Sequence, residues 1–188
     1  GAANPALTFQ ITGFQNGETL GTSGVTGTPN ISTSATSTSG PGAYPITAAQ
    51  GTLAAPNYTF ATANGTLTVT QAATTTTITN ASALGNSTVV GQNYPVNWTT
   101  SPVAPGAGTP TGNVTVSDGT GNTCTAAVAA GTCSLASTLG PKTITATYAG
   151  DANFGASTSQ AVQHNVVIGL TGNVKQFIAF GTNVNLAG

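Results

Sequence analysis

The stretch Leu139–Phe154 reads LGPKTITATYAGDANF, and its central part has a strict period of two. Apolar side chains alternate with threonines in the order Thr143, Ile144, Thr145, Ala146, Thr147, Tyr148. Successive side chains of a strand point to opposite faces, so the alternation gives one apolar and one hydroxyl row. The flanking pairs Gly140-Pro141 and Gly150-Asp151 are residue types that favour turns. The stretch therefore predicts a half-buried β-strand between two turns.

Charged side chains are rare in this chain. They make up 3% of its 188 residues, whereas an ordinary soluble protein has about 25%. Low charge with many Ser, Thr and Gly also occurs in disordered chains, but those carry high net charge and few β-branched residues. Here 38% of the residues are apolar and they alternate with polar ones. We therefore expect a folded all-β chain, of a length that suits one large or two small domains.

The net charge of −1 argues against two classes of partner. Nucleic acids and anionic membranes attract proteins through clustered Lys and Arg, and this chain has only two such residues. No apolar run approaches the roughly 18–20 residues of a membrane-spanning helix, and the N-terminus lacks the features of a signal peptide. We expect no nucleic-acid partner, no membrane insertion, and an export signal outside this range.

Two cysteines, Cys124 and Cys133, are separated by eight residues. They could be two unrelated buried thiols, as free cysteines often are. We favour a disulfide across a hairpin with Gly131 near its turn, which would stabilise by about 2–3 kcal/mol and indicate an oxidising compartment. A metal site is not expected, because His164 is the only histidine and no second cysteine pair completes a tetrahedral set.

Residues 1–71 are predicted to form a first small β domain. Its expected strands alternate and are bordered by Gly, Pro or Asn; their apolar residues are Leu7, Phe9 and Ile11, then Tyr44 and Ile46, then Tyr58 and Phe60, then Leu67 and Val69. The segments Asn4-Pro5-Ala6-Leu7-Thr8, Ile11-Thr12-Gly13-Phe14, Gly42-Ala43-Tyr44-Pro45-Ile46 and Asn64-Gly65-Thr66-Leu67-Thr68-Val69 resemble the MBG-type repeat of bacterial surface proteins. Members of that family usually begin with a strand before the position of Gly1, so a strand is expected to be missing here.

Residues 72–165 are predicted to form a second domain, a β-sandwich with Trp98 as its largest core residue. The segments Gly112-Asn113-Val114-Thr115-Val116, Gly131-Thr132-Cys133 and Tyr148-Ala149-Gly150-Asp151-Ala152-Asn153-Phe154 resemble the bacterial Ig-like repeat of large surface and secreted proteins. The resemblance implies an Ig-like sandwich. The cysteines are too close in sequence for the antibody-type bridge between sheets, so none is expected.

Residues 166–188 are too apolar for a solvated tail. Their apolar side chains are Val166, Val167, Ile168, Leu170, Val174, Phe177, Ile178, Phe180, Val184 and Leu186. The segment could open a further repeat that is cut short here. Alternatively it is a donor strand that fills the gap in the first domain of a neighbouring copy, by pairing along an open sheet edge.

No group of residues points to catalysis. General acid–base or nucleophilic chemistry needs positioned titratable groups, and only His164, Glu18, Asp118 and Asp151 could serve. The two aspartates lie in Gly- and Asn-bearing turns, where a role in the turn itself is expected. A calcium site would need six to eight oxygen ligands. We expect no enzyme, no cofactor and no metal.

What remains is a structural role outside the cell. Edge strands are normally protected from pairing by Lys, Pro or inward charges, which are scarce here. We expect an extracellular piece of a bacterial surface fibre or adhesin stalk, which self-associates or packs against neighbouring repeats. The alternative is a carbohydrate- or surface-binding accessory module of a larger exported protein.

Overall fold

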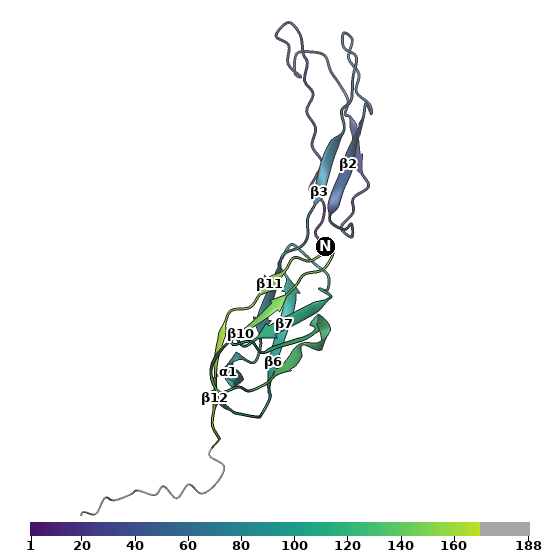
Figure 1. Ribbon diagram of the computed structural model, residues 1–188. Coiled ribbons are helices and arrows are strands. Elements are labelled where there is room, and N and C mark those ends of the chain that lie inside the picture. The colour runs from purple at the N-terminus through teal and green to yellow at the C-terminus, as the bar shows by residue number, and fades with distance from the viewer. Residues whose placement is uncertain (170–188) are drawn as a thin grey trace, which may run out of the picture.

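The computed structural model describes residues 1–169, which form two β units in tandem (Figure 1). The all-β prediction is confirmed, with 40% of the residues in strands and 4% helical. The first unit is drawn in purple to blue and the second in teal to yellow-green in Figure 1. The chain passes from one unit to the other at Ala72, where Ala72 forms a parallel bridge to Phe154.

The first unit contains one antiparallel sheet of three strands, in the order β1-β2-β3. These strands are β1 (Asn30–Thr33), β2 (Gly42–Ala49) and β3 (Gly65–Val69). Alternate side chains of each strand are half-buried and the others are exposed, as expected for a sheet with one covered face. The predicted strands around Ile46 and Leu67 are therefore present.

Two other predicted strands of the first unit are wrong. The structure has no strand between residues 1 and 29, and residues 55–64 are also irregular. Leu7 and Ile11 are half-buried whereas Phe9 is 49% exposed, so these three side chains do not form one strand face. Tyr58 is held instead through its side chain, which donates a hydrogen bond to Glu18 and packs edge-on against Phe14.

The second unit is a sandwich of two sheets, as predicted. One sheet has the order β4-β6-β9, formed by β4 (Thr74–Ile78), β6 (Tyr94–Pro102) and β9 (Thr132–Leu135). The other has the order β5-β12-β10-β7-β8, formed by β5 (Thr88–Val89), β12 (Val162–Val167), β10 (Gly140–Tyr148), β7 (Asn113–Ser117) and β8 (Thr123–Ala127). The short β11 (Ser157–Thr158) also pairs with β10. The helix α1 (Ala81–Leu84) and the 3-10 turn Val128–Ala130 were not expected.

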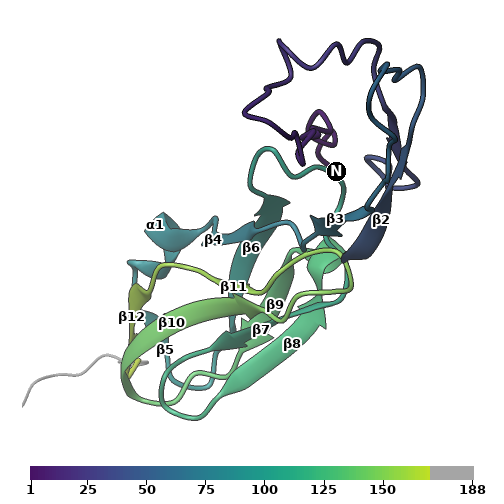
Figure 2. The same cartoon turned by 90° about the horizontal axis from the view of Figure 1, so that it is seen from above.

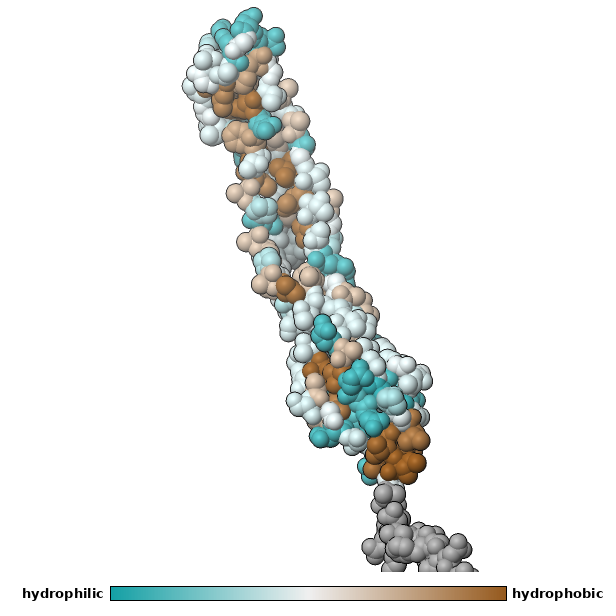
Figure 3. Space-filling model, turned by 90° about the vertical axis from the view of Figure 1, so that its left-hand side faces the viewer, coloured by the Kyte–Doolittle hydropathy of each residue, from teal (hydrophilic) through white to brown (hydrophobic). Residues whose placement is uncertain are grey.

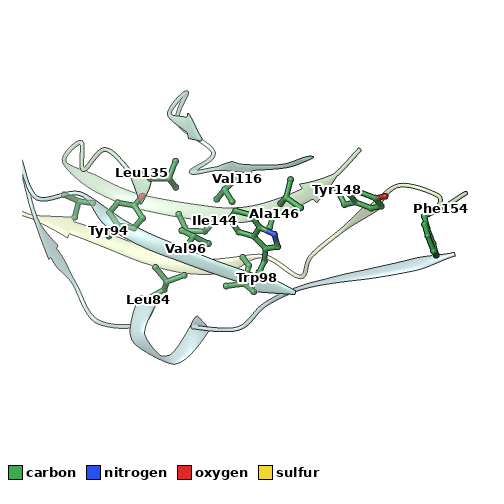
Figure 4. Close-up of a cluster of buried hydrophobic side chains, with 13 residues drawn as sticks. Leu84, Tyr94, Val96, Trp98, Val116, Leu135, Ile144, Ala146, Tyr148 and Phe154 are labelled. Carbon is green, nitrogen blue, oxygen red and sulfur yellow. The ribbon is translucent and has the colours of Figure 1, made fainter. Parts of the chain in front are cut away.

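The strand predicted from the stretch Leu139–Phe154 is β10, and it lies at the centre of the sandwich. Its even-numbered side chains from Lys142 to Tyr148 are all buried. The three apolar ones, Ile144, Ala146 and Tyr148, meet side chains of the opposite sheet in a core of thirteen buried apolar residues (Figure 4). Trp98 is 3% exposed, which agrees with its predicted place in the core.

The two ends of the sandwich differ in what they face. Tyr148 ends β10 near the first unit, whereas Gly140 begins it at the opposite end and pairs there with Val166. We call this opposite end the far pole. β12 therefore runs away from the first unit and ends at the far pole (Figures 1 and 2).

Candidate functional site

The first unit is much less buried than the second. Ala35 and Leu53 are the only apolar side chains of this unit that are buried, each with 7% exposure. A three-stranded sheet needs a packed hydrophobic face for independent stability. The first unit therefore has a thin core beside the sandwich, and Figure 3 shows brown apolar side chains at the surface along this arm.

Both edges of this sheet are open within residues 1–169, because β1 and β3 each pair only with β2. The N-terminal segment runs on the β3 side in Figures 1 and 2, yet residues 1–15 make no hydrogen bond to β3. The only charged residue of the first unit is Glu18, and its carboxylate accepts the Tyr58 hydroxyl. Neither edge therefore carries a charge that would oppose pairing with another strand.

A second exposed apolar surface lies at the far pole. Val90, Leu139 and Ile168 are 44%, 59% and 69% exposed, and they line a shallow hollow together with Val89 and Gly169. We call Val89, Val90, Leu139 and Ile168 the far-pole patch. In Figure 3 a brown patch of this kind adjoins the grey atoms. The chain leaves the described structure at this patch.

The predicted disulfide between Cys124 and Cys133 is present. The predicted hairpin is wrong, because Cys124 lies on β8 and Cys133 on β9, and these strands belong to different sheets. The 3-10 turn Val128–Ala130 and Gly131, which has a φ of +66°, carry the chain from one sheet to the other. The disulfide thus joins the two sheets at one side of the sandwich, contrary to our expectation.

The main polar feature of the second unit is a buried ion pair. The Lys142 Nζ lies 3.5 Å from the Asp118 Oδ2, with 2% and 0% of the side chains exposed. The lysine also donates to the hydroxyls of Thr120 and Thr138, at 2.8 and 2.6 Å. Asp118 accepts the backbone N–H groups of Thr120 and Asn122, at 2.8 and 3.1 Å. This is the turn role that we expected for Asp118.

The network around Asp118 favours its charged form. Burial raises the pKa of the Asp118 carboxyl, but hydrogen bonds from Asn122 and Thr120 outweigh this effect and lower the pKa to about 2. The carboxylate is therefore ionised at neutral pH and balances the buried Lys142 charge. Burial, with a smaller contribution from the Asp118 charge, raises the pKa of Tyr94 to about 12.

Tyr94 and His164 pack against each other beside this ion pair. Their ring centroids are 4.2 Å apart, and both side chains are 4% exposed. The His164 Nδ1 lies 2.8 Å from the Leu84 carbonyl, which can only accept, so Nδ1 carries the proton. His164 therefore holds α1 against β12.

Asp151 fixes the loop that receives the first unit. Its carboxylate accepts the Thr111 hydroxyl and backbone N–H, at 2.6 and 2.8 Å, and the N–H groups of Asn153 and Phe154. These hydrogen bonds lower the pKa of the Asp151 carboxyl, and the one from the Thr111 hydroxyl contributes most to this shift. In the same loop, the Asn153 carbonyl accepts a hydrogen bond of 2.9 Å from the backbone N–H of Ala72, the residue that joins the two units.

Two candidate donor residues belong to the sandwich instead. Val166 is 1% exposed and pairs with both Gly140 and Thr88, and Val167 pairs with Val89. The prediction that Val166 and Val167 belong to the donor segment is therefore wrong. The second domain does not end at residue 165 as expected, because β12 continues to Val167. Ile168 is exposed in the far-pole patch. The other candidates lie outside the described residues: Leu170, Val174, Phe177, Ile178, Phe180, Val184 and Leu186.

The sequence interpretation missed the burial of Lys142, although the signal was present. Lys142 has the same parity in β10 as Ile144, Ala146 and Tyr148, so it occupies an inward position. An inward lysine needs a buried acidic partner.

Within residues 1–169 no three His, Cys, Asp or Glu side chains come together, and the described part contains no helix of the length and apolarity of a membrane span.

Family comparisons agree with the order of the two units. Residues 1–68 match the model of the MBG domain (YGX type), and residues 50–167 match the bacterial Ig-like domain (group 3). The overlapping residues contain most of β3, which pairs with β2 in the first unit. No curated protein and no solved structure matches the chain. Both families are non-catalytic repeat domains typical of surface or secreted proteins. Since the second match spans more than half of the chain, the protein belongs to the bacterial Ig-like domain (group 3) family.

Proposed function

We propose that this chain is a non-enzymatic structural segment of an extracellular bacterial fibre or adhesin stalk, and that copies join end to end by strand donation. The observation that carries the proposal is the first unit, which buries only two apolar side chains, both outside its strands, and whose sheet has two open, uncharged edges. The same chain carries an apolar segment, residues 170–188, that starts at the far pole. A donated strand from one copy would complete the sheet of the next.

The titratable groups of the second unit support a structural role. Asp118 and Lys142 neutralise each other in the core, Asp151 fixes the junction loop, and His164 holds α1. Each of these groups is engaged by the fold itself. The disulfide supports an oxidising, extracellular location.

Self-association is favoured over a charged partner by the nearly neutral surface. The chain has only five charged side chains, and three of them are already engaged. Asp118 and Lys142 form an ion pair, and Glu18 accepts a hydrogen bond from Tyr58. Assembly should therefore rest on apolar burial and strand pairing, which depend little on ionic strength. A carbohydrate site is less well supported, because Phe9 is the only exposed aromatic side chain in the described part of the chain.

Light scattering over a wide range of concentrations tests the proposal. The unmodified chain should form large assemblies, and Ile178→Asp/Phe180→Asp should abolish them by placing charges in the apolar row of the tail. Thr171→Asp/Asn173→Asp is the matched control, because it adds the same charge at polar positions near the start of the tail. A monodisperse monomer of the unmodified chain at every concentration would overturn the proposal.

A further inference from the structure

We propose that the acceptor site for the donated strand is the free edge of β3, and that its occupant is the segment Gln176–Leu186 of a second copy. This inference rests on the proposed function and specifies where the copies meet. It commits to one of the two open edges of the first-unit sheet. The far-pole patch then lies beside the start of the donating segment.

The two edges differ in how well they can accept a strand. β1 has four residues and follows directly on Pro29, which lacks the N–H that a ladder needs. β3 has five residues, Gly65–Val69, without proline or charge. Its outward side chains Thr66 and Thr68 are exposed, and its inward Leu67 and Val69 are half-buried. A strand added at β3 would extend the apolar row across the sheet.

The donor segment has the matching pattern. In residues 170–188 six even-numbered positions are large and apolar: Leu170, Val174, Ile178, Phe180, Val184 and Leu186. Of the odd positions, Asn183 and Asn185 are polar and Phe177 departs from the pattern, and Lys175 is the only charge of the segment. A strand with this period of two presents its even residues beside Leu67 and Val69 and its asparagines beside the threonines.

The course of β12 favours an acceptor in another copy. β12 ends at the far pole, so the chain leaves the sandwich on the side opposite the first unit. β10 has nine residues and is about 30 Å long, so a return to its own β3 would use about half of the segment. Donation to a neighbour is a head-to-tail contact between different surfaces, and such contacts produce open filaments when the rotation between copies does not close a ring.

Cysteine cross-linking between two separately prepared full-length variants tests the edge. Thr68→Cys places a thiol on the exposed face of β3, and Ser32→Cys places one on the exposed face of β1 as the matched control. Each is mixed with Ala179→Cys, Asn183→Cys or Asn185→Cys and mildly oxidised. Directly opposite residues on paired strands lie about 4.5–5.5 Å apart at Cα, within disulfide range.

The expected result is a mixed disulfide dimer from Thr68→Cys with at least one tail variant, and only background from Ser32→Cys. Peptide mapping identifies the bond and separates it from exchange with Cys124–Cys133. Assemblies that persist without any Thr68 cross-link, or that cross-link through Ser32, would overturn the β3 edge while strand donation stands. A single chain that carries both Thr68→Cys and a tail cysteine is tested in parallel. Cross-linking within this double variant, but not between the mixed single variants, would show that the tail binds its own chain and would overturn the inference. Absence of assemblies in the unmodified chain would overturn the proposed function itself.

Discussion

Removing Asp118 should destabilise the second unit strongly, because it leaves the charge of Lys142 buried without a counter-ion. Lys142 is 2% exposed, and its remaining partners would be the neutral hydroxyls of Thr120 and Thr138. Breaking one partner of a buried ion pair costs about 3–5 kcal/mol. We therefore expect Asp118→Ala to lower the free energy of unfolding by about 4 kcal/mol.

The cost should fall when both charges are removed. In Asp118→Ala/Lys142→Met the turn loses its acceptor, but no uncompensated charge stays in the core, and we expect a loss of about 2 kcal/mol. Lys142→Met alone should cost about 1–2 kcal/mol, since Asp118 keeps its hydrogen bonds from Thr120 and Asn122. The double variant should thus be more stable than Asp118→Ala.

Urea unfolding followed by tryptophan fluorescence measures these values. Trp98 is the only tryptophan and lies buried in the same sandwich, so its emission reports on this unit. At a denaturant slope of about 1–3 kcal/mol per M, a loss of 4 kcal/mol lowers the midpoint by about 1–4 M. The reasoning is refuted if Asp118→Ala costs less than about 1 kcal/mol or if Lys142→Met lowers the stability of Asp118→Ala further.

Three further predictions concern pH, the disulfide and the tip of the first unit. Because the pKa of Asp118 is lowered from 3.8 to about 2, its ionised form contributes about 2 kcal/mol above pH 4, and this contribution should be lost as the pH falls toward 2. Trp98 fluorescence is the readout, and Asp118→Asn is the control, which should lose less stability on acidification because only the Asp151 contribution remains. Cys124→Ala/Cys133→Ala should cost about 2–3 kcal/mol in the same urea assay, and an unchanged midpoint would contradict a clamp between the sheets. Tyr58→Phe removes the hydroxyl that joins Glu18 to the loop 55–60, so limited proteolysis should cut residues 13–23 or 50–64 faster while the Trp98 midpoint stays constant.

The sandwich was largely predictable because its strands bury one full row of side chains. β10 shows this most clearly, since the alternation that ends at Tyr148 coincides with burial at every even position from Lys142. A period of two specifies a strand only where one face of that strand is covered. In residues 1–29 the alternation of Leu7, Phe9 and Ile11 meets no such face, and it therefore gave a false strand.

Other features depend on contacts that local sequence does not encode. Whether β8 and β9 pair with each other or join different sheets depends on strands far away in the chain, so the disulfide between sheets was not foreseen. The end of β12 at Val167 likewise depends on its parallel pairing with β5. The acidic partner of Lys142 is 24 positions earlier, and only the parity of Lys142 within its strand pointed to it.

The most direct measurement of the central claim is negative-stain electron microscopy of the full chain beside a chain that ends at Gly169. The described pairings of both units are complete before that residue, so the shorter chain keeps the fold. We predict unbranched filaments for the full chain and single elongated particles for the shorter one. Single particles in both samples, or filaments in both, would contradict assembly by donation of residues 170–188.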